Sequence, residues 1–106
     1  MTSATTNSLK QLRKDGYLYA IVEHWNPHAG IRQDLYGFID ILAIKEGEIL
    51  GVQTTSKKCF SDHVQKIIKH KNFIAVKKSG IRIILHGWEK EAVGKRLLWK
   101  CKEKIF

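Results

Sequence analysis

The stretch GFIDILAIKEGEILGVQTTS, from Gly37 to Ser56, decides the fold. Its first half is apolar apart from Asp40, which is typical of a strand that is buried on both faces. The turn KEGE supplies Gly47 for a positive φ angle and returns the chain as an antiparallel strand. In an unbroken hairpin about this turn, the numbers of paired residues add up to about 93, which places Asp40 opposite Gln53. A carboxylate and a carboxamide then face one spot, unless the register slips by one residue.

The position of Asp40 within an apolar strand predicts a site rather than a surface charge. Burying an unpaired carboxylate costs roughly several kcal/mol, so this side chain needs a metal ion, a cationic partner or a cleft. Oxygen ligands suit a hard cation such as Mg²⁺, which makes a metal site the leading interpretation. A buried salt bridge to Arg32 is the alternative for Asp40. A hydrogen bond that closes the sheet edge is the alternative for Gln53.

Composition points to nucleic acid as the partner. The chain has 106 residues, of which 43% are hydrophobic, so we expect one domain with one core, spanning residues 1–106. Lys and Arg number 19 against 10 Asp and Glu, and the resulting net charge of +9 suits a polyanion. A protein that is merely basic is the alternative. No apolar run approaches the ~18 residues that span a bilayer, so we expect no membrane contact and a cytoplasmic location. Two cysteines without a C-x-x-C pair argue against a zinc knuckle.

Local signals predict an α/β fold. Before the hairpin we expect a disordered lead (1–7) and then a helix that begins at Leu9, with Ser8 as its N-cap and Gly16 at its end. A strand (17–25) and an irregular loop (26–33) follow. The next strand begins at Asp34 or Gly37 and runs to Ile44. After it we expect helix from Ser56 or Ser61 to Gly80, then strands 81–88 and 96–106 linked by residues 89–95. The result is an αβββαβ core with a central mixed sheet, flanking helices and an extra C-terminal strand.

This order of elements and the pieces DLYGFIDILAI, ILGVQTTS and RIILHGWEK resemble the PD-(D/E)XK nuclease superfamily, and within it the small phage-type nucleases related to Holliday junction resolvases. The resemblance implies a restriction-endonuclease-like core that hydrolyses DNA phosphodiester bonds with Mg²⁺ or Mn²⁺ in a phage-infected bacterial cell. By resemblance, Asp40 stands for the motif aspartate, Gln53 for the second acid and Thr55 for the lysine. The chain departs from the family pattern at the last two positions, because glutamine carries no charge and threonine no ammonium.

Two other acids could restore the missing charge. Glu23 ends the first expected strand beside the same sheet, and we take it as the third metal ligand and a catalytic candidate with Asp40 and Gln53. Asp34 is a further catalytic candidate. It would lie roughly 20 Å from Asp40 along an unbroken strand, so only a bend at Gly37 could bring it into the site.

Basic residues near the motif offer further roles. Lys57 or Lys58 could replace the family lysine, or both could simply contact the DNA backbone. His24 and His28 flank the loop beside the site and could act as a general base or orient a phosphate. The residues that we expect to contact phosphates are Arg13, Arg32, Lys57, Lys58, Lys66 and Lys69.

The chain shows no sequence-reading module such as a zinc finger, so we expect cutting that is selective for branched or nicked DNA. Such substrates have two-fold character, and we therefore expect a symmetric homodimer. Two alternatives stay open. The fold could have lost catalysis and only bind nucleic acid, or the protein could be a homing or restriction endonuclease with a defined target site.

Overall fold

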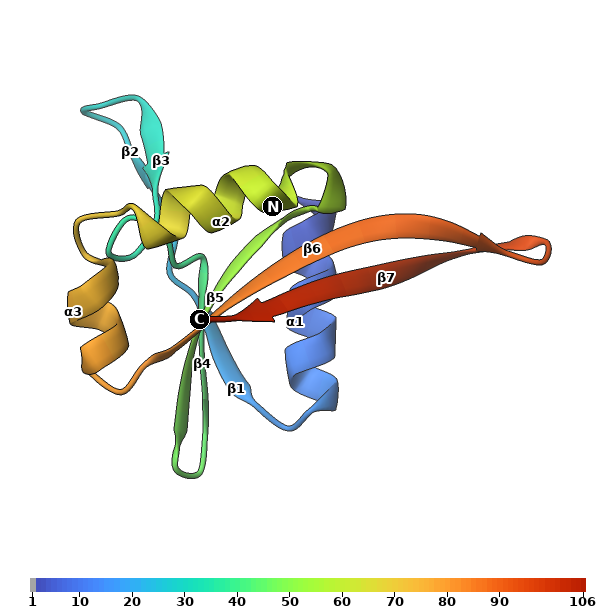
Figure 1. The fold of residues 1–106 in the computed structure, drawn as a ribbon, viewed down its shortest axis with the longest axis horizontal. Coiled ribbons are helices and arrows are strands. Elements are labelled where there is room, and N and C mark those ends of the chain that lie inside the picture. Colours follow the sequence, from blue (N-terminus) through green and yellow to red (C-terminus); the bar gives the residue numbers. More distant parts are fainter. Residues whose placement is uncertain (1) are drawn as a thin grey trace.

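The computed structural model describes residues 2–106 as an α/β fold around a five-stranded mixed sheet (Figure 1). The strand order is β1-β4-β5-β6-β7, in which β5 and β6 are parallel and the other neighbours are antiparallel. A separate two-stranded ribbon pairs β2 with β3. The elements are α1 (Ser3–Lys14), β1 (Leu18–Ile21), β2 (His24–Asn26), β3 (Ile31–Gln33), β4 (Ile41–Lys45), β5 (Glu48–Ser56), a 3₁₀ turn (Lys57–Cys59), α2 (Phe60–Ile68), α3 (Phe73–Lys78), β6 (Arg82–Val93) and β7 (Arg96–Ile105).

The predicted hairpin is confirmed with its register. Strands β4 and β5 pair antiparallel from Ile41 with Val52 to Lys45 with Glu48, so all paired numbers add up to 93. Gly47 has the expected positive φ of 75° in the turn. Asp40 directly precedes β4, and its backbone N–H continues the ladder by donating to the Val52 carbonyl at 2.9 Å.

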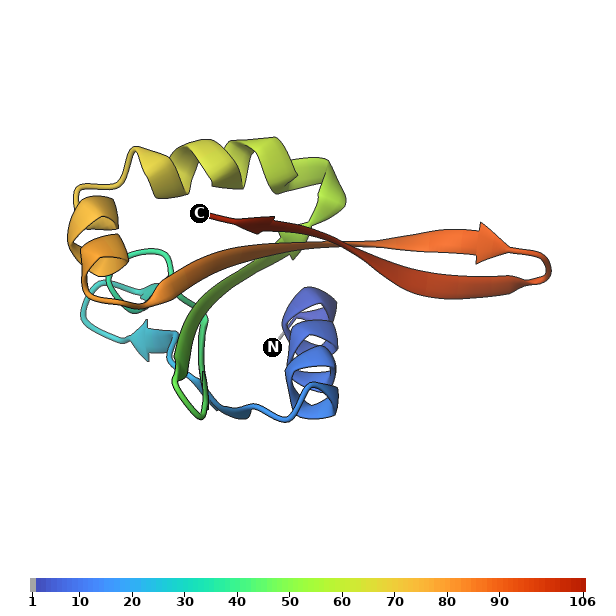
Figure 2. The same ribbon diagram turned by 60° about the horizontal axis from the view of Figure 1, so that its bottom comes forward.

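Helices cover both faces of the sheet, as Figure 2 shows, with α1 on one side and α2 and α3 on the other. The expected two-faced burial of the hairpin is therefore observed. The α1 side holds a core of Leu9, Leu12, Ile41, Ala43, Leu50, Val52 and Ile84. The opposite side holds Phe38, Ile39, Phe60, Ile67, Val76, Ile83 and Leu85.

The N-terminal helix begins earlier than expected. The Thr2 side chain accepts a hydrogen bond from the Thr5 backbone N–H and caps a helix that starts at Ser3. The prediction of a disordered lead is therefore wrong from Ser3 onward, while Met1 lies outside the described residues. Ser8 is no cap either, because it is fully buried and bonded to the side chains of β6. The predicted helix end holds, with Gly16 at φ 88°.

The expected strand 17–25 is divided in two. β1 ends at Ile21, and the following residues form the β2–β3 ribbon, so the loop expected at 26–33 contains a strand. The Asn26 side chain closes the ribbon by accepting hydrogen bonds from the backbone N–H groups of His28 and Ala29, at 3.0 and 3.2 Å. This local turn favours pairing within the segment over extension of the main sheet.

The last two strands form a long arm that projects from the body in both views (Figures 1 and 2). β6 runs to Val93, so the expected link 89–95 shrinks to a turn at Gly94 and Lys95. Every residue of β7 is exposed. Among residues 2–106, none of the helices is long and apolar enough to cross a membrane.

Candidate metal centre

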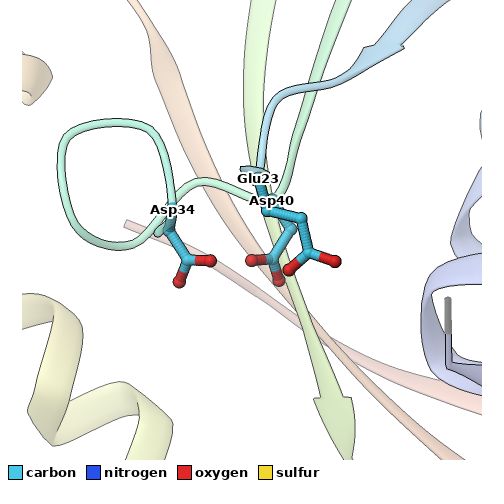
Figure 3. Close-up of side chains that lie close together, drawn as sticks. All are labelled: Glu23, Asp34 and Asp40. Atoms are coloured by element: carbon cyan, nitrogen blue, oxygen red, sulfur yellow. The ribbon is translucent and has the colours of Figure 1, made fainter. Parts of the chain in front are cut away.

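Three carboxylates converge at one end of the sheet. Oxygen atoms of Glu23, Asp34 and Asp40 all lie within 4.8 Å of one another (Figure 3). Glu23 follows β1, Asp34 follows β3 and Asp40 precedes β4, so the cluster forms where three strand ends meet. Glu23 and Asp34 also mark where the chain enters and leaves the β2–β3 ribbon. Both acids lie at the same, open end of the ribbon, because Glu23 precedes β2 and Asp34 follows β3.

A tight loop brings Asp34 to Asp40. The chain reverses through positive φ angles at Tyr36 (56°) and Gly37 (93°), and the Gly37 N–H donates to the Asp34 carbonyl at 3.0 Å. Leu35 and Ile39 then face each other across an isolated bridge. The expected strand therefore starts only at Ile41, and the bend at Gly37 places Asp34 in the site. The spacing of roughly 20 Å that an unbroken strand would give does not apply.

Asp40 is the most deeply buried acid of the cluster, with 6% of its surface exposed. Its Oδ2 accepts a hydrogen bond from the Thr54 backbone N–H at 2.9 Å. The pKa of Asp40 is raised from 3.8 to about 8, mainly by burial. The hydrogen bond with Asp34 and the charges of Asp34 and Glu23 raise this pKa further, whereas the hydrogen bond from the Thr54 N–H lowers it. Arg32 pairs with Glu23 at 3.5 Å, so the alternative of an Asp40–Arg32 salt bridge is not what the structure contains.

Gln53 lines the same pocket and is almost fully buried. Its Nε2 donates to Asp34 Oδ2 at 3.3 Å, and its Oε1 lies 3.2 Å from His63 Nδ1. The carboxamide therefore connects an acid of the cluster to helix α2. Gln53 thus makes hydrogen bonds, but it does not close a sheet edge, because β5 lies between β4 and β6 inside the sheet. Its position instead lets it orient Asp34.

Helix α2 contributes two polar groups. His63 and Lys66 lie three residues apart and so share one face of the helix. The Lys66 ammonium lies 3.7 Å from Asp34 Oδ2. Burial lowers the pKa of His63, and the Lys66 charge lowers it further. His63 is thus biased toward the neutral form, which donates a hydrogen bond from one ring nitrogen and can accept a proton at the other.

The remaining candidates lie elsewhere or contribute less. Thr55 is buried opposite Gly87 of β6 and is not among the described residues that line the pocket, so it does not occupy the place of a lysine at the site. Lys57 pairs with Glu89 at 2.8 Å, and Lys58 is exposed; neither lines the pocket in the described chain. Of the six expected phosphate contacts, Arg32 and Lys66 line the pocket. Lys69 is exposed just after the end of α2, and Arg13 donates to Tyr19 at the far end of α1.

Sequence reasoning missed the part that the helices play. Thr5 of α1 lines the pocket and its hydroxyl lies 3.1 Å from that of Thr54, although this segment was expected to be disordered. His63 had no expected role in the site, and Lys66 was expected only at phosphates. The spacing of His63 and Lys66 beside the buried Ile67 was the one available signal, since it places both next to the side of α2 that packs on the sheet.

Together these groups line a pocket of about 350 Å³ that combines three acids with two cations. Its residues are Thr2, Thr5, Glu23, Arg32, Asp34, Asp40, Gln53, Thr54, His63 and Lys66. No family model, curated protein or solved structure matches this chain.

Proposed function

We propose that this protein is a metal-dependent endonuclease that hydrolyses DNA phosphodiester bonds. The observation that carries the proposal is the convergence of Glu23, Asp34 and Asp40 within 4.8 Å in a chain whose net charge is +9. Like charges at this distance repel each other unless a proton or a cation lies between them. A basic surface around such a centre fits a polyanionic substrate.

The donor set fits Mg²⁺ or Mn²⁺. The three carboxylates offer only oxygen, which these hard cations prefer, and Thr54 and Gln53 hold two of the acids by hydrogen bonds, as second-layer partners of metal ligands commonly do. Glu23, Asp34 and Asp40 would hold the ion. When bound, the ion lowers the pKa of a coordinated water and withdraws charge from the attacked phosphate.

The neighbouring residues supply the other functions of a hydrolytic site. Lys66 stands 3.7 Å from Asp34 and takes over the electrostatic function of the missing motif lysine, because its ammonium can neutralise charge on a phosphate oxygen. Arg32 and Lys66 bind phosphate beside the acids. His63 can accept a proton at Nε2, since its Nδ1–H donates to the Gln53 carboxamide oxygen.

The preferred substrate is branched or nicked DNA, and the preferred assembly is a homodimer that presents two such sites. The DNA substrate and the homodimer are parts of the proposal that go beyond the metal centre. A further part is that the protein acts in the cytoplasm of a phage-infected cell. A protein that only binds nucleic acid is the competing function. The replacements at Gln53 and Thr55 favour it, and the assay below separates the two.

Cleavage of supercoiled and four-way DNA tests the proposal. We expect the wild type to nick DNA with Mn²⁺ or Mg²⁺ and not with EDTA. We expect Asp40→Asn to lose activity by at least about 10³-fold, since it replaces a charged carboxylate ligand of the centre with a neutral amide. Glu46→Gln, which removes an exposed acid in the hairpin turn, is the matched control and should cut normally. Binding by both proteins with no metal-dependent cleavage by either would instead identify a nucleic-acid binder.

Lys66 provides a second test. Lys66→Ala is expected to lower the cleavage rate by about 10²–10³-fold, because one positive group at the transferring phosphate is lost. Lys66→Arg should recover part of the rate, since it keeps the charge. Lys78→Ala removes an exposed lysine from α3 and should change the rate little. Single-turnover rates with saturating metal measure the effect, and equal rates for the two alanine variants would remove Lys66 from the mechanism.

A further inference from the structure

A second pocket adjoins the metal centre and has the opposite charge. It measures about 570 Å³, within the size range of small-molecule sites, and shares Arg32, Asp34 and Lys66 with the carboxylate pocket. Its residues are Val22, His24, Arg32, Gln33, Asp34, Leu35, Tyr36, Gly37, Lys66, His70, Lys71 and Asn72. Three of these are Lys or Arg and one is an acid, so the pocket favours an anion.

The walls of this pocket are held in place. The Asn72 amide donates to the Tyr36 carbonyl at 3.0 Å, and the Asn72 backbone N–H donates to His70 Nδ1 at 3.1 Å. A Cβ at Gly37 would collide with the His70 ring, so only glycine lets the loop approach α2 this closely. The loop after β3 and the turn after α2 therefore form a preformed wall.

Tyr36 is held in an unfavourable backbone conformation at the pocket. Its φ of 56° makes it the one described residue other than glycine with a positive φ, a strain that tends to occur at functional sites. Its side chain is 51% exposed, so folding gains little from burying it. An aromatic residue in the same pocket as three cations suits a nucleotide, whose base can stack on the aromatic face while its phosphate meets positive charge.

We propose that this pocket seats the nucleotide next to the cleaved phosphodiester, with the phosphate on Arg32, Lys66 and Lys71 and the base against Tyr36. The identity of the polymer rests on the proposed function. Arg32, Asp34 and Lys66 belong to both pockets. A DNA strand with one phosphate at the carboxylates would therefore continue directly into the cationic pocket. The base at that position must be unstacked from its neighbours, which favours branched or single-stranded DNA.

Binding of small probes in EDTA tests this without cleavage or metal. NMR titrations would compare thymidine 5′-monophosphate, inorganic phosphate, thymidine and a tetrathymidylate. We expect the monophosphate to bind at least tenfold more tightly than phosphate or thymidine, and the tetranucleotide more tightly still. Phosphate that binds as well as the nucleotide would overturn the assignment, as would a tetranucleotide that binds no better than the monophosphate.

Variants connect the binding to the pocket. Lys71→Ala should weaken the binding of the monophosphate about tenfold. Lys78→Ala, which removes an exposed lysine on α3, should leave this binding unchanged. Tyr36→Gly relieves the positive φ, so it should fold normally while it removes the advantage of the nucleotide over phosphate. Unchanged binding by either pocket variant would refute the inference. Nucleotide binding without any nuclease activity would support the nucleotide site itself and refute the proposed function, and with it the position of this site next to a cleaved bond.

Discussion

The metal-free Asp40→Asn variant is expected to be more stable than the wild type at pH 8, by several kcal/mol. The pKa of Asp40 is about 8 in the folded protein, against an ordinary value of 3.8, so folding favours its protonated form. The stability that comes from this proton is fully present below pH 3.8 and is lost as the pH rises through about 8. Asparagine imitates the protonated acid and needs no proton.

The measurement is the unfolding temperature in EDTA between pH 5 and pH 8. Over this range, the free energy of unfolding of the wild type should fall, relative to that of Asp40→Asn, by up to about 1.4 kcal/mol for each pH unit of increase. The resulting difference in unfolding temperature is roughly 10 °C or more at pH 8. Glu46→Gln should follow the wild type, because this exposed side chain lies in the hairpin turn. Parallel curves for the wild type and Asp40→Asn would contradict the assignment of a buried, protonated Asp40.

A bound metal ion should stabilise the wild type most at high pH, where the metal-free wild type is least stable. A cation binds the ionised cluster, so its affinity rises with pH as Asp40 loses its proton. An ion at 100 times its dissociation constant stabilises the fold by about 2.7 kcal/mol. We therefore expect Mn²⁺ to raise the unfolding temperature of the wild type more at pH 8 than at pH 6, and to leave Asp40→Asn unchanged. An equal response from both proteins would place the ion elsewhere.

The hairpin could be predicted from the sequence because its information is local. Gly47 fixes the turn, the turn fixes the register, and the register puts Asp40 level with Gln53. The apolar residues around Asp40 fixed a strand with helices on both faces. None of these steps needs a contact between residues far apart in the chain.

The rest of the site depends on packing that no local pattern encodes. Asp34 enters the cluster through a loop in which Tyr36 takes a conformation that its side chain disfavours, so propensity argued for a continuous strand. Lys66 reaches the acids only because α2 lies across the end of β5. The segment before Ser8 looked too polar to fold, yet Thr2 and Thr5 line the pocket and the capping oxygen comes from Thr2.

The second large effect is expected at Ser8, which joins α1 to the sheet. Its buried Oγ accepts from Trp88 Nε1 at 2.8 Å and lies 2.9 Å from His86 Nδ1. The Glu103 carboxylate, whose Oε2 lies 3.2 Å from His86 Nε2, can only accept, so a neutral His86 carries its proton on Nε2 and its Nδ1 accepts from the serine hydroxyl. Burial lowers the pKa of His86, which agrees with a neutral ring in this chain of hydrogen bonds.

Ser8→Ala is therefore expected to destabilise the fold by about 2–4 kcal/mol, since it leaves the indole N–H and the imidazole nitrogen buried without partners. The same change at the exposed Ser61 of α2 should stay within about 0.5 kcal/mol. Urea unfolding of both variants at pH 8 measures the difference. In the wild type, stability that depends on neutral His86 should be lost as the pH falls below about 6.5, because the unfolded chain then takes up the proton first. A Ser8→Ala protein as stable as Ser61→Ala would mean that this buried chain contributes nothing to holding α1 on the sheet.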